Sequence, residues 1–311
     1  MKLITSLDFI SIKSPVVTLG IFDGVHKGHQ HVISTLINTA KSIDGESVML
    51  TFWPHPRIVL NPKLKDQVRL LNTLKEKELN VNKYNVDYLI ILPFTTELSK
   101  LTTEEFVKTI LLDKIKMKAL IIGNNHRFGS DGDYNFEAYQ LMAKNNNFEV
   151  YSVDALKKND ERISSTQIRK FILEGNIKLA NNYLGYNYSI TGKVVEGSRI
   201  GRQIGFPTAN IKVEDTLKLI PSLGVYAVMV DVDNKTYKGM LNIGYRPTII
   251  EQEKQVSIEV HLFDFDEDIY NKEVNLNFVD KLRNEKKFNG IEELKLQLEK
   301  DKSLALQILS L

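Results

Sequence analysis

The order of apolar patterns along the 311-residue chain constrains its fold more than any other feature. In the first half, short apolar runs typical of buried strands alternate with segments whose apolar residues recur at helical spacing. Because strand, helix and strand follow one another repeatedly, we expect an α/β fold with a parallel sheet covered on both faces. The expected strands are Pro15–Phe22, Ser47–Trp53, Val86–Leu92, Ala119–Gly123 and Phe148–Val153. The expected helices are His29–Ile43, Asp133–Asn146, Ser165–Leu173 and one that begins at a capping box of Thr102 and Glu105.

The pattern changes near Leu184–Tyr188, after which strand-like runs follow one another with turn signals between them. This order predicts a small antiparallel barrel or sandwich, followed by a helix over Ile291–Ile308. We therefore expect two domains, over residues 1–184 and 185–311. The expected strands of the second domain are Ser189–Val195, Val225–Val232, Lys238–Ile243, Gln255–Phe263 and Val274–Val279.

Composition narrows the class of protein further. Hydrophobic residues make up 42% and charged residues 26%, which is an ordinary globular balance, and the formal net charge is only +2. Lys and Arg are scattered, so we expect neither nucleic acid nor a membrane surface as partner. The chain has no cysteine, which excludes disulfides and thiolate metal sites. We see no signal peptide or membrane-spanning run and expect a cytoplasmic protein, and the sequence carries no signal for an oligomeric state.

The first candidate site is the glycine-rich segment Thr18–His31, which follows the first expected strand and opens the first long helix. A helix amino terminus offers free N–H groups and a positive dipole end, which suits a phosphate. His26 and His29 are three residues apart, so both imidazoles can lie on one side of the first turn and stabilise charge on a phosphoryl group. The alternatives are a metal site that also uses His31, or ordinary surface histidines.

A second segment, Ile163–Arg169, crowds Ser164, Ser165 and Thr166 at the expected start of a helix. Helix capping explains one hydroxyl group but not three. The guanidinium of Arg169, about one turn into the helix, can hold a phosphate with two parallel hydrogen bonds. Taken alone, the segment fits a helix cap as well as a phosphate site. Because the histidine segment occurs in the same expected domain, we interpret this segment as a phosphate site.

Two further segments lie at the ends of expected strands. In Thr51–Arg57, prolines on both sides of His55 fix the shape of a loop, and this loop could simply be a rigid connector. In Gly123–Gly129, Asn125 and Phe128 follow the fourth strand. An aromatic side chain there fits a core position or a stacking surface for a flat ligand.

The second domain opens with a segment punctuated by glycines, which ends in Pro207, Thr208, Ala209 and Asn210. Hydroxyl and amide oxygens are ligands that Mg²⁺ accepts together with substrate phosphates, although local chemistry alone favours a turn. In the strand-like run around Glu259, alternation places this carboxylate and His261 on one face. Such a glutamate is usually solvated, but beside a pocket it is a natural general base for an alcohol that attacks a γ-phosphate.

Taken together, the segments GIFDGVHKGHQ, TFWPHPR, HRFG, ISSTQIR, GRQIGFPTAN, NIGYRPT and EVHLFDFDEDIY resemble the bacterial bifunctional riboflavin kinase/FAD synthetase family, in that family's order and over nearly the whole chain. The resemblance implies a Rossmann-like FMN adenylyltransferase domain, then a six-stranded antiparallel barrel that phosphorylates riboflavin. It also implies ATP as a substrate of both reactions and Mg²⁺ as a cofactor that accompanies ATP.

The resemblance also assigns roles to residues of this chain. It implies ATP binding in the adenylyltransferase by Gly20, Phe22, Asp23, Gly24, His26, His29, Ser164, Thr166 and Arg169. It implies ATP binding in the kinase by Gly192, Gly201, Gly205, Thr208 and Asn210, the last two also holding the metal. Asn125, Phe128, Arg283 and Phe288 would lie near flavin, and His26, His29, Arg169 and Glu259 would be catalytic. The chain departs from its relatives at Asn124 and Asn125, where they often carry an aromatic residue and an aspartate.

Two other functions fit part of the pattern. A nucleotidyltransferase for another phosphate ester would share the histidine segment but leave the GFPTAN segment unexplained. A flavin-binding regulator would bind flavin without turning over ATP, and the presence of Thr208, Asn210 and Glu259 argues against it.

Overall fold

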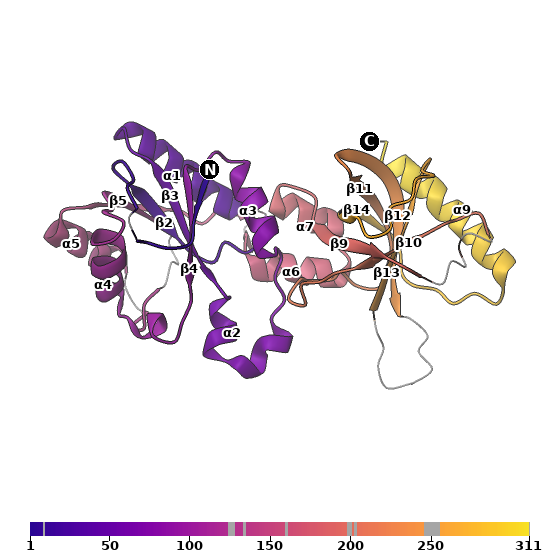
Figure 1. Cartoon of the computed structure of the whole chain (residues 1–311), viewed down its shortest axis with the longest axis horizontal. Helices are drawn as coiled ribbons and strands as arrows, with labels where there is room; N and C mark the ends of the chain where they lie inside the picture. The colour runs from indigo at the N-terminus through magenta and orange to yellow at the C-terminus, as the bar shows by residue number, and fades with distance from the viewer. Residues whose placement is uncertain are drawn as a thin grey trace. The chain divides into compact units, whose positions relative to one another are not determined.

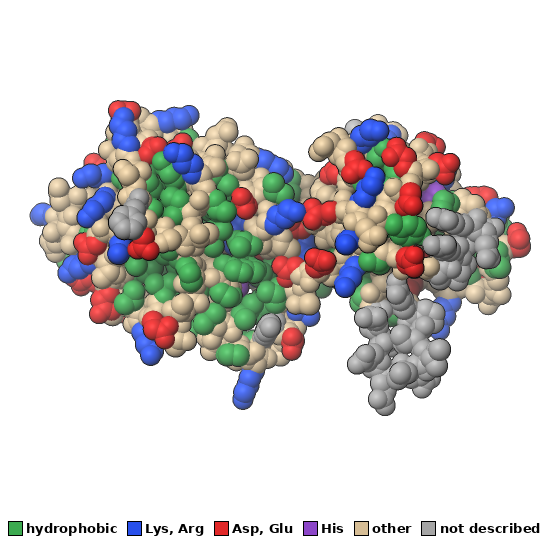
Figure 2. Space-filling view, viewed as in Figure 1, with side chains coloured by type: hydrophobic (Ala, Val, Ile, Leu, Met, Phe, Trp, Pro, Cys, Tyr) green, Lys and Arg blue, Asp and Glu red, His purple; other side chains and the backbone are tan. Residues whose placement is uncertain are grey.

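A computed structural model describes residues 1–8, 10–123, 128–132, 135–158, 161–197, 201, 204–245 and 256–310 (Figure 1). The chain divides into two compact units, Met1–Ser165 and Thr166–Leu311. Figure 2 shows Lys and Arg side chains interspersed with Asp and Glu on the visible face of both units.

The first unit is built on a six-stranded parallel sheet in the order β1-β4-β3-β2-β5-β6. Its strands are β1 (Lys2–Ile4), β2 (Val16–Leu19), β3 (Ser47–Trp53), β4 (Tyr88–Pro93), β5 (Ala119–Gly123) and β6 (Glu149–Val153), and a separate hairpin pairs β7 (Lys157–Lys158) with β8 (Glu161–Arg162). Its helices are α1 (Lys27–Ser42), α2 (Pro56–Leu60), η1 (Pro62–Gln67), α3 (Leu74–Asn82), η2 (Leu98–Lys100), α4 (Thr103–Phe106), the π-helical turn η3 (Val107–Leu112) and α5 (Phe136–Asn146).

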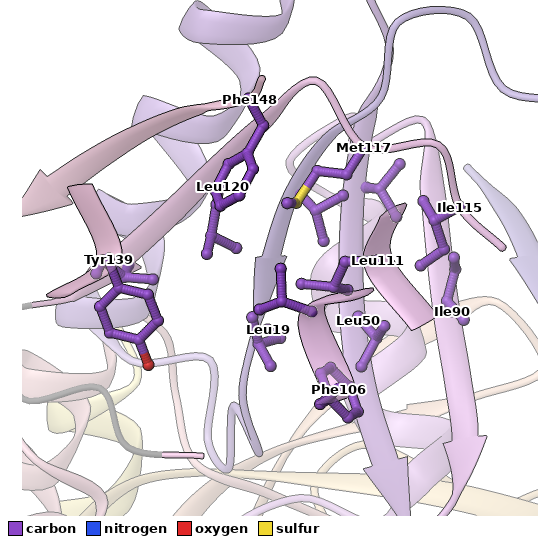
Figure 3. Packing of buried hydrophobic residues seen from close by; sticks show 14 of the residues in the cluster. Leu19, Leu50, Ile90, Phe106, Leu111, Ile115, Met117, Leu120, Tyr139 and Phe148 are labelled. Atoms are coloured by element: carbon purple, nitrogen blue, oxygen red, sulfur yellow. The ribbon is translucent and has the colours of Figure 1, made fainter. Parts of the chain in front are cut away.

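Alternate residues of the strands supply two apolar layers, one on each face of the sheet. On one face, Leu19, Leu50 and Ile90 pack against Phe106 and Tyr139 from the α4 and α5 side (Figure 3). On the other face, the neighbouring strand residues pack against α1 and α3. Central strands are buried on both faces, which explains their continuous apolar runs.

The second unit contains a closed antiparallel barrel in the order β10-β13-β12-β11-β14-β9. Its elements are α6 (Ser165–Glu174), which starts at the last residue of the first unit, α7 (Ile177–Leu184), β9 (Ser189–Val195), β10 (Ala209–Lys212), β11 (Gly224–Val232), β12 (Lys235–Tyr245), β13 (Val256–Leu262), β14 (Glu273–Arg283) and α9 (Ile291–Ile308). Asp233 and Asn234 both have positive φ and form the two-residue turn between β11 and β12. Helix α9 covers the outer side of the barrel, where Leu298 and Ala305 join a cluster with Phe206 and Met240.

The fold matches the predicted classes, and the differences lie in single elements. Helix α1 begins two residues earlier than predicted, because the side chain of His26 caps it. Helix α5 begins at Phe136 rather than residue 133, since Asn135 is its cap. The elements that were not predicted are strands β1, β7, β8 and β10 and helices α2, α3, α7, η1 and η2.

Candidate active sites

The loop that carries His26 and leads into α1, where His29 lies, is at the point where the strand order of the sheet reverses. From β2 the chain builds outward through β3 and β4, and it then returns to place β5 on the other side of β2. Ligands of open α/β sheets bind in the crevice beyond the carboxyl ends of the strands at such a point. The segment from Gly20 to His26 connects β2 to α1 at this place.

This loop holds an unusual backbone conformation. Phe22, Gly24 and Val25 have φ of 49°, 85° and 37°, and a β-branched residue such as Val25 is rarely found there. The buried carboxylate of Asp23 fixes the loop by accepting hydrogen bonds from the backbone N–H of Leu71 (2.9 Å) and of Asn72 (3.1 Å). Strain of this kind persists only where surrounding contacts determine the conformation, and it clusters at binding sites.

The imidazole rings of His26 and His29 stack, with centroids 3.6 Å apart and planes at 16°. His26 Nδ1 accepts a hydrogen bond of 3.3 Å from the backbone N–H of His29, so His26 also caps α1. Gly28 makes room for this arrangement, because a Cβ atom there would lie 3.2 Å from the His26 ring. The Phe22 ring meets His29 edge-on at 5.3 Å. The two rings therefore lie together, but His26 is buried whereas His29 is partly exposed.

The environment of His29 favours its neutral form. Burial is the main cause that lowers its pKa well below the usual value, and the positive charges of His26, Lys77 and Arg162 lower this pKa further. Its Nδ1 atom is buried and has no hydrogen-bond partner. An anion beside the ring would reverse this effect, since a nearby negative charge favours the imidazolium. The arrangement suits a site that binds a phosphate next to His29.

Lys77 is a charged residue near this site that the sequence interpretation missed. It lies on α3, its side chain is 3% exposed, and its Nζ donates to the backbone carbonyl of Ile21 (2.7 Å) and to Thr51 Oγ1 (3.3 Å). Burial lowers the pKa of Lys77 to about 8, against the opposing effect of Asp23. The capping box of Thr73 and Glu76 was the available signal for α3.

The segment with the three hydroxyl groups reaches the same loop through Ser165. Its hydroxyl group donates to the backbone carbonyl of Asp23 at 2.8 Å, and Ser164, the residue before it, is partly buried. Arg169 lies one turn into α6, and its Nη2 is 3.4 Å from Thr166 Oγ1. Thr166 and Arg169 belong to the second unit.

Other predicted site residues of the first unit have different surroundings. Phe128 packs edge-on against Phe106 at 5.3 Å and lies 5.9 Å from the ring of Tyr139, on the apolar core. Asn124 and Asn125 lie outside the described residues. His55 caps α2, and Nδ1 accepts a hydrogen bond from Arg57 N–H at 3.1 Å. Over the described part of the chain, no group of three His, Cys, Asp or Glu side chains could hold a metal ion.

The second site forms on the barrel, where three polar residues face one another across neighbouring strands. Asn210 on β10 and Asn242 on β12 both pair with Glu259 on the strand between them. Thr208 Oγ1 donates a hydrogen bond of 3.2 Å to Glu259 Oε2, just before β10 begins. The predicted residues Thr208, Asn210 and Glu259 therefore lie together, and Asn242 is a fourth polar residue that the sequence interpretation missed.

His261 holds the chain that carries Thr208. Its Nδ1 lies 2.7 Å from the backbone carbonyl of Pro207, and burial lowers the pKa of His261, which favours the neutral ring with a proton on Nδ1. The glycines around the segment are sterically required. A Cβ atom on Gly201 would lie 2.2 Å from the Phe206 carbonyl, and one on Gly192 would lie 2.5 Å from Ile211. Gly205 has φ of 82°, a conformation that favours glycine.

The resemblance places Arg283 and Phe288 near riboflavin. Arg283 is the last residue of β14, and Phe288 lies in the connection from β14 to α9. The guanidinium of Arg283 forms a two-pronged ion pair with the buried carboxylate of Asp301 on α9: Nε donates to Oδ1 at 3.0 Å, and Nη2 donates to Oδ2 at 2.7 Å. The ring of Phe288 lies 5.7 Å from the same guanidinium. The structure thus gives Arg283 a role in fixing α9 to the barrel.

Comparison with known proteins identifies the family. A family model described as FAD synthetase matches residues 10–167, and one described as riboflavin kinase matches residues 184–309. The chain belongs to the bifunctional riboflavin kinase/FMN adenylyltransferase family. A family member from Listeria monocytogenes is 40% identical over 92% of this chain and 90% of its own length. One from Bacillus subtilis is 35% identical over 95% of this chain and 92% of its own length.

A solved structure shares the whole fold. The crystal structure of a protein described as a macrolide-efflux protein from Streptococcus pneumoniae has a TM-score of 0.90 and 32% identity, and the match covers 98% of each chain. Among the residues that the structure describes here, no helix combines the length and apolar character that a membrane span requires.

Proposed function

We propose that this chain phosphorylates riboflavin to FMN with ATP, and then transfers an adenylyl group from a second ATP to FMN, which yields FAD and pyrophosphate. The observation that carries the proposal is that one chain holds two clusters of polar side chains suited to phosphates, the stacked His26 and His29 and the hydrogen-bonded Thr208 and Glu259. The matches to both family models support the same pair of reactions.

In the adenylyl transfer, a phosphate oxygen of FMN attacks the α-phosphorus of ATP, and the bond to the bridging oxygen of pyrophosphate breaks. Negative charge grows on the transferred group and on the leaving pyrophosphate. We propose that His26, His29 and the amino terminus of α1 stabilise this charge, with backbone N–H groups of the loop from Gly20 to Gly24. Ser164, Thr166 and Arg169 would hold the triphosphate, and Asn125 and Phe128 would lie near flavin.

In the kinase reaction, the terminal hydroxyl group of riboflavin attacks the γ-phosphorus of ATP, and ADP leaves. We propose that Glu259 accepts the proton of this hydroxyl group, because its carboxylate lies beside Thr208 and between two polar residues of neighbouring strands. Gly192, Gly201 and Gly205 would shape the ATP-binding loop, and Arg283 and Phe288 would lie by riboflavin.

The residues around Glu259 fit a magnesium ion in the kinase. Thr208 and Asn210 supply oxygen atoms, which are the ligands that Mg²⁺ prefers, and a magnesium ion shared with phosphates needs few protein ligands. When bound, Mg²⁺ neutralises charge on the phosphates. Thr208 would bind it through its hydroxyl group and Asn210 through its amide oxygen.

We assign adenylyl transfer to residues 1–184 and riboflavin phosphorylation to residues 185–311. Since both reactions consume ATP, we propose that the protein works in the cytoplasm. The test is to incubate the purified chain with riboflavin, ATP and Mg²⁺ and to separate the flavins by chromatography. FMN should appear first and FAD later, and the absence of both would reject the proposal.

A further inference from the structure

Lys77 connects three segments of the first unit with one buried side chain. It lies on α3, and its ammonium group donates to the carbonyl of Ile21, in the loop from Gly20 to His26, and to the hydroxyl group of Thr51 on β3. An ammonium group has three N–H donors, so these two contacts leave one for a further acceptor. Because Lys77 contacts the loop directly, it can position the loop as well as fill space in the core.

The contacts from α3 hold the loop on both sides of Phe22. Lys77 binds the carbonyl of Ile21, and the carboxylate of Asp23 accepts from the backbone N–H groups of Leu71 and Asn72, just before α3. Phe22 lies between these two fixed points with its φ of 49°, and its ring packs edge-on against His29. Displacement of Lys77 would therefore move the ring that contacts His29.

The charge of Lys77 also reaches the histidines. A buried ammonium is costly, so a chain that needed only a hydrogen-bond donor at this place could use a neutral side chain. The buried carboxylate of Glu76, the residue before Lys77, accepts a hydrogen bond from the backbone N–H of Thr73. The charge of Asp23 raises the pKa of Lys77, and the charge of Lys77 in turn lowers the pKa of His29, as do those of His26 and Arg162. Lys77 therefore adds positive charge beside His29, which suits a phosphate.

We propose that Lys77 is a positioning residue for adenylyl transfer, which holds the Ile21–Asp23 backbone so that His29 meets the ATP phosphates and adds a buried positive charge behind them. This inference rests on the proposed adenylyltransferase activity. It differs from a packing role because it requires the charge of Lys77 as well as its shape.

The test compares Lys77→Met and Lys77→Arg with the wild-type chain and with Lys75→Met, which changes an exposed lysine of the same helix. FAD formation from FMN is measured as kcat and as KM for ATP across a pH series, and FMN formation from riboflavin on the same samples reports the second unit. Because kcat/KM reports the ionisation of the unliganded enzyme, the wild-type value for ATP should fall as the pH rises above about 8.

Lys77→Met should lower kcat/KM for ATP by about 100-fold at neutral pH and should lack the fall above about pH 8. Lys77→Arg should restore the rate to within about tenfold and stay flat over this range, because arginine keeps its charge. Lys75→Met should follow the wild type, and FMN formation should be unchanged in all variants.

Two results would overturn the proposal: wild-type kcat/KM in Lys77→Met, or a slower Lys77→Met whose pH profile has the wild-type shape. If Lys77→Met fails to fold, the test is the comparison of the wild type with Lys77→Arg. Identical pH profiles of kcat/KM in these two proteins would reject the role of the charge. A wild-type chain that forms FMN but no FAD at any pH would instead refute the adenylyltransferase activity itself.

Discussion

At the scale of the residue, His29 owes its chemistry to its surroundings rather than to its position in the sequence. Burial and three basic neighbours lower the pKa of the imidazole and keep it neutral in the free protein. Its buried Nδ1 atom has no hydrogen-bond partner. A bound phosphate supplies the missing negative charge and favours protonation of the ring. The ring speeds the transfer to the extent that this interaction strengthens as negative charge builds up in the transition state.

We predict that His29→Ala stops the reaction sequence at FMN. The loss of a donor to the developing charge should slow FAD formation by about 100- to 1,000-fold. FMN formation should be unchanged, because Glu259 and Thr208 lie in the other unit. Chromatography of a riboflavin reaction should show FMN accumulating, with His31→Ala, an exposed histidine on the same helix, as the control. Loss of both flavin products in a folded His29→Ala protein would contradict the assignment.

For Glu259 we predict the reverse pattern, with loss of FMN formation and unchanged FAD formation from added FMN. Glu259→Gln keeps the shape of the side chain but removes the base, so FMN formation should slow by about 100- to 10,000-fold. The rate of FAD formation from added FMN should remain at the wild-type value. Both rates can be measured on one preparation by supplying riboflavin or FMN. A Glu259→Gln protein that phosphorylates riboflavin normally would exclude Glu259 as the general base.

At the scale of the element, the ion pair between Arg283 and Asp301 fixes α9 against the barrel. Asp301 is 3% exposed, and its carboxylate also accepts a hydrogen bond of 2.9 Å from Gln297. Removal of this carboxylate would leave the guanidinium of Arg283 without its main partner. We predict that Asp301→Ala lowers the free energy of unfolding by about 3 kcal/mol, as measured by urea denaturation. Glu299→Gln, which changes an exposed carboxylate on the same helix, should have little effect.

A double-mutant cycle tests whether this loss comes from the pair. In an Arg283→Met background, Asp301→Ala should cost clearly less than in the wild type, because the partner is already absent. Equal losses in both backgrounds would show that the two side chains are not coupled. If Arg283→Met leaves stability unchanged but raises KM for riboflavin, the role beside riboflavin would be favoured over the structural one.

The elements also show what the sequence could predict. The bounds of β3, β5, β9 and α9 were predicted correctly, because each is a continuous or regularly spaced apolar run. Strands β1 and β10 were missed, since three or four residues carry too little pattern and their partners are distant in the chain. Helix α3 was missed because it buries polar residues, among them Glu76, Lys77 and Asn80.

The same reasoning applies to the sites. The histidine pair could be predicted because its spacing, glycines and place after a strand all lie in one short segment. Lys77 could not, since lysines are normally exposed and its burial depends on Ile21 and Thr51, which are far away in the sequence. Asn242 was missed for a similar reason, because only the register of β12 with β13 brings it beside Glu259.

At the scale of the whole molecule, the two reactions are linked by one intermediate, FMN. The His29 and Glu259 sites lie in different compact units, so we expect a substitution in one to leave the other unaltered. The His29→Ala protein should therefore form FMN from riboflavin, and the Glu259→Gln protein should convert FMN to FAD. Since FMN is a small charged molecule, we expect it to leave the kinase site and to reach the second enzyme through solution.

We predict that a mixture of His29→Ala and Glu259→Gln proteins converts riboflavin to FAD, although neither protein does so efficiently alone. FAD should appear after a lag in which FMN accumulates, because the second reaction must wait for its substrate to build up in solution. A time course of both flavins by chromatography measures the lag, and added FMN should abolish it. If the mixture forms FMN but no FAD, while Glu259→Gln still adenylylates added FMN, then FMN remains bound where it is made. The two activities would in that case have to reside on the same chain.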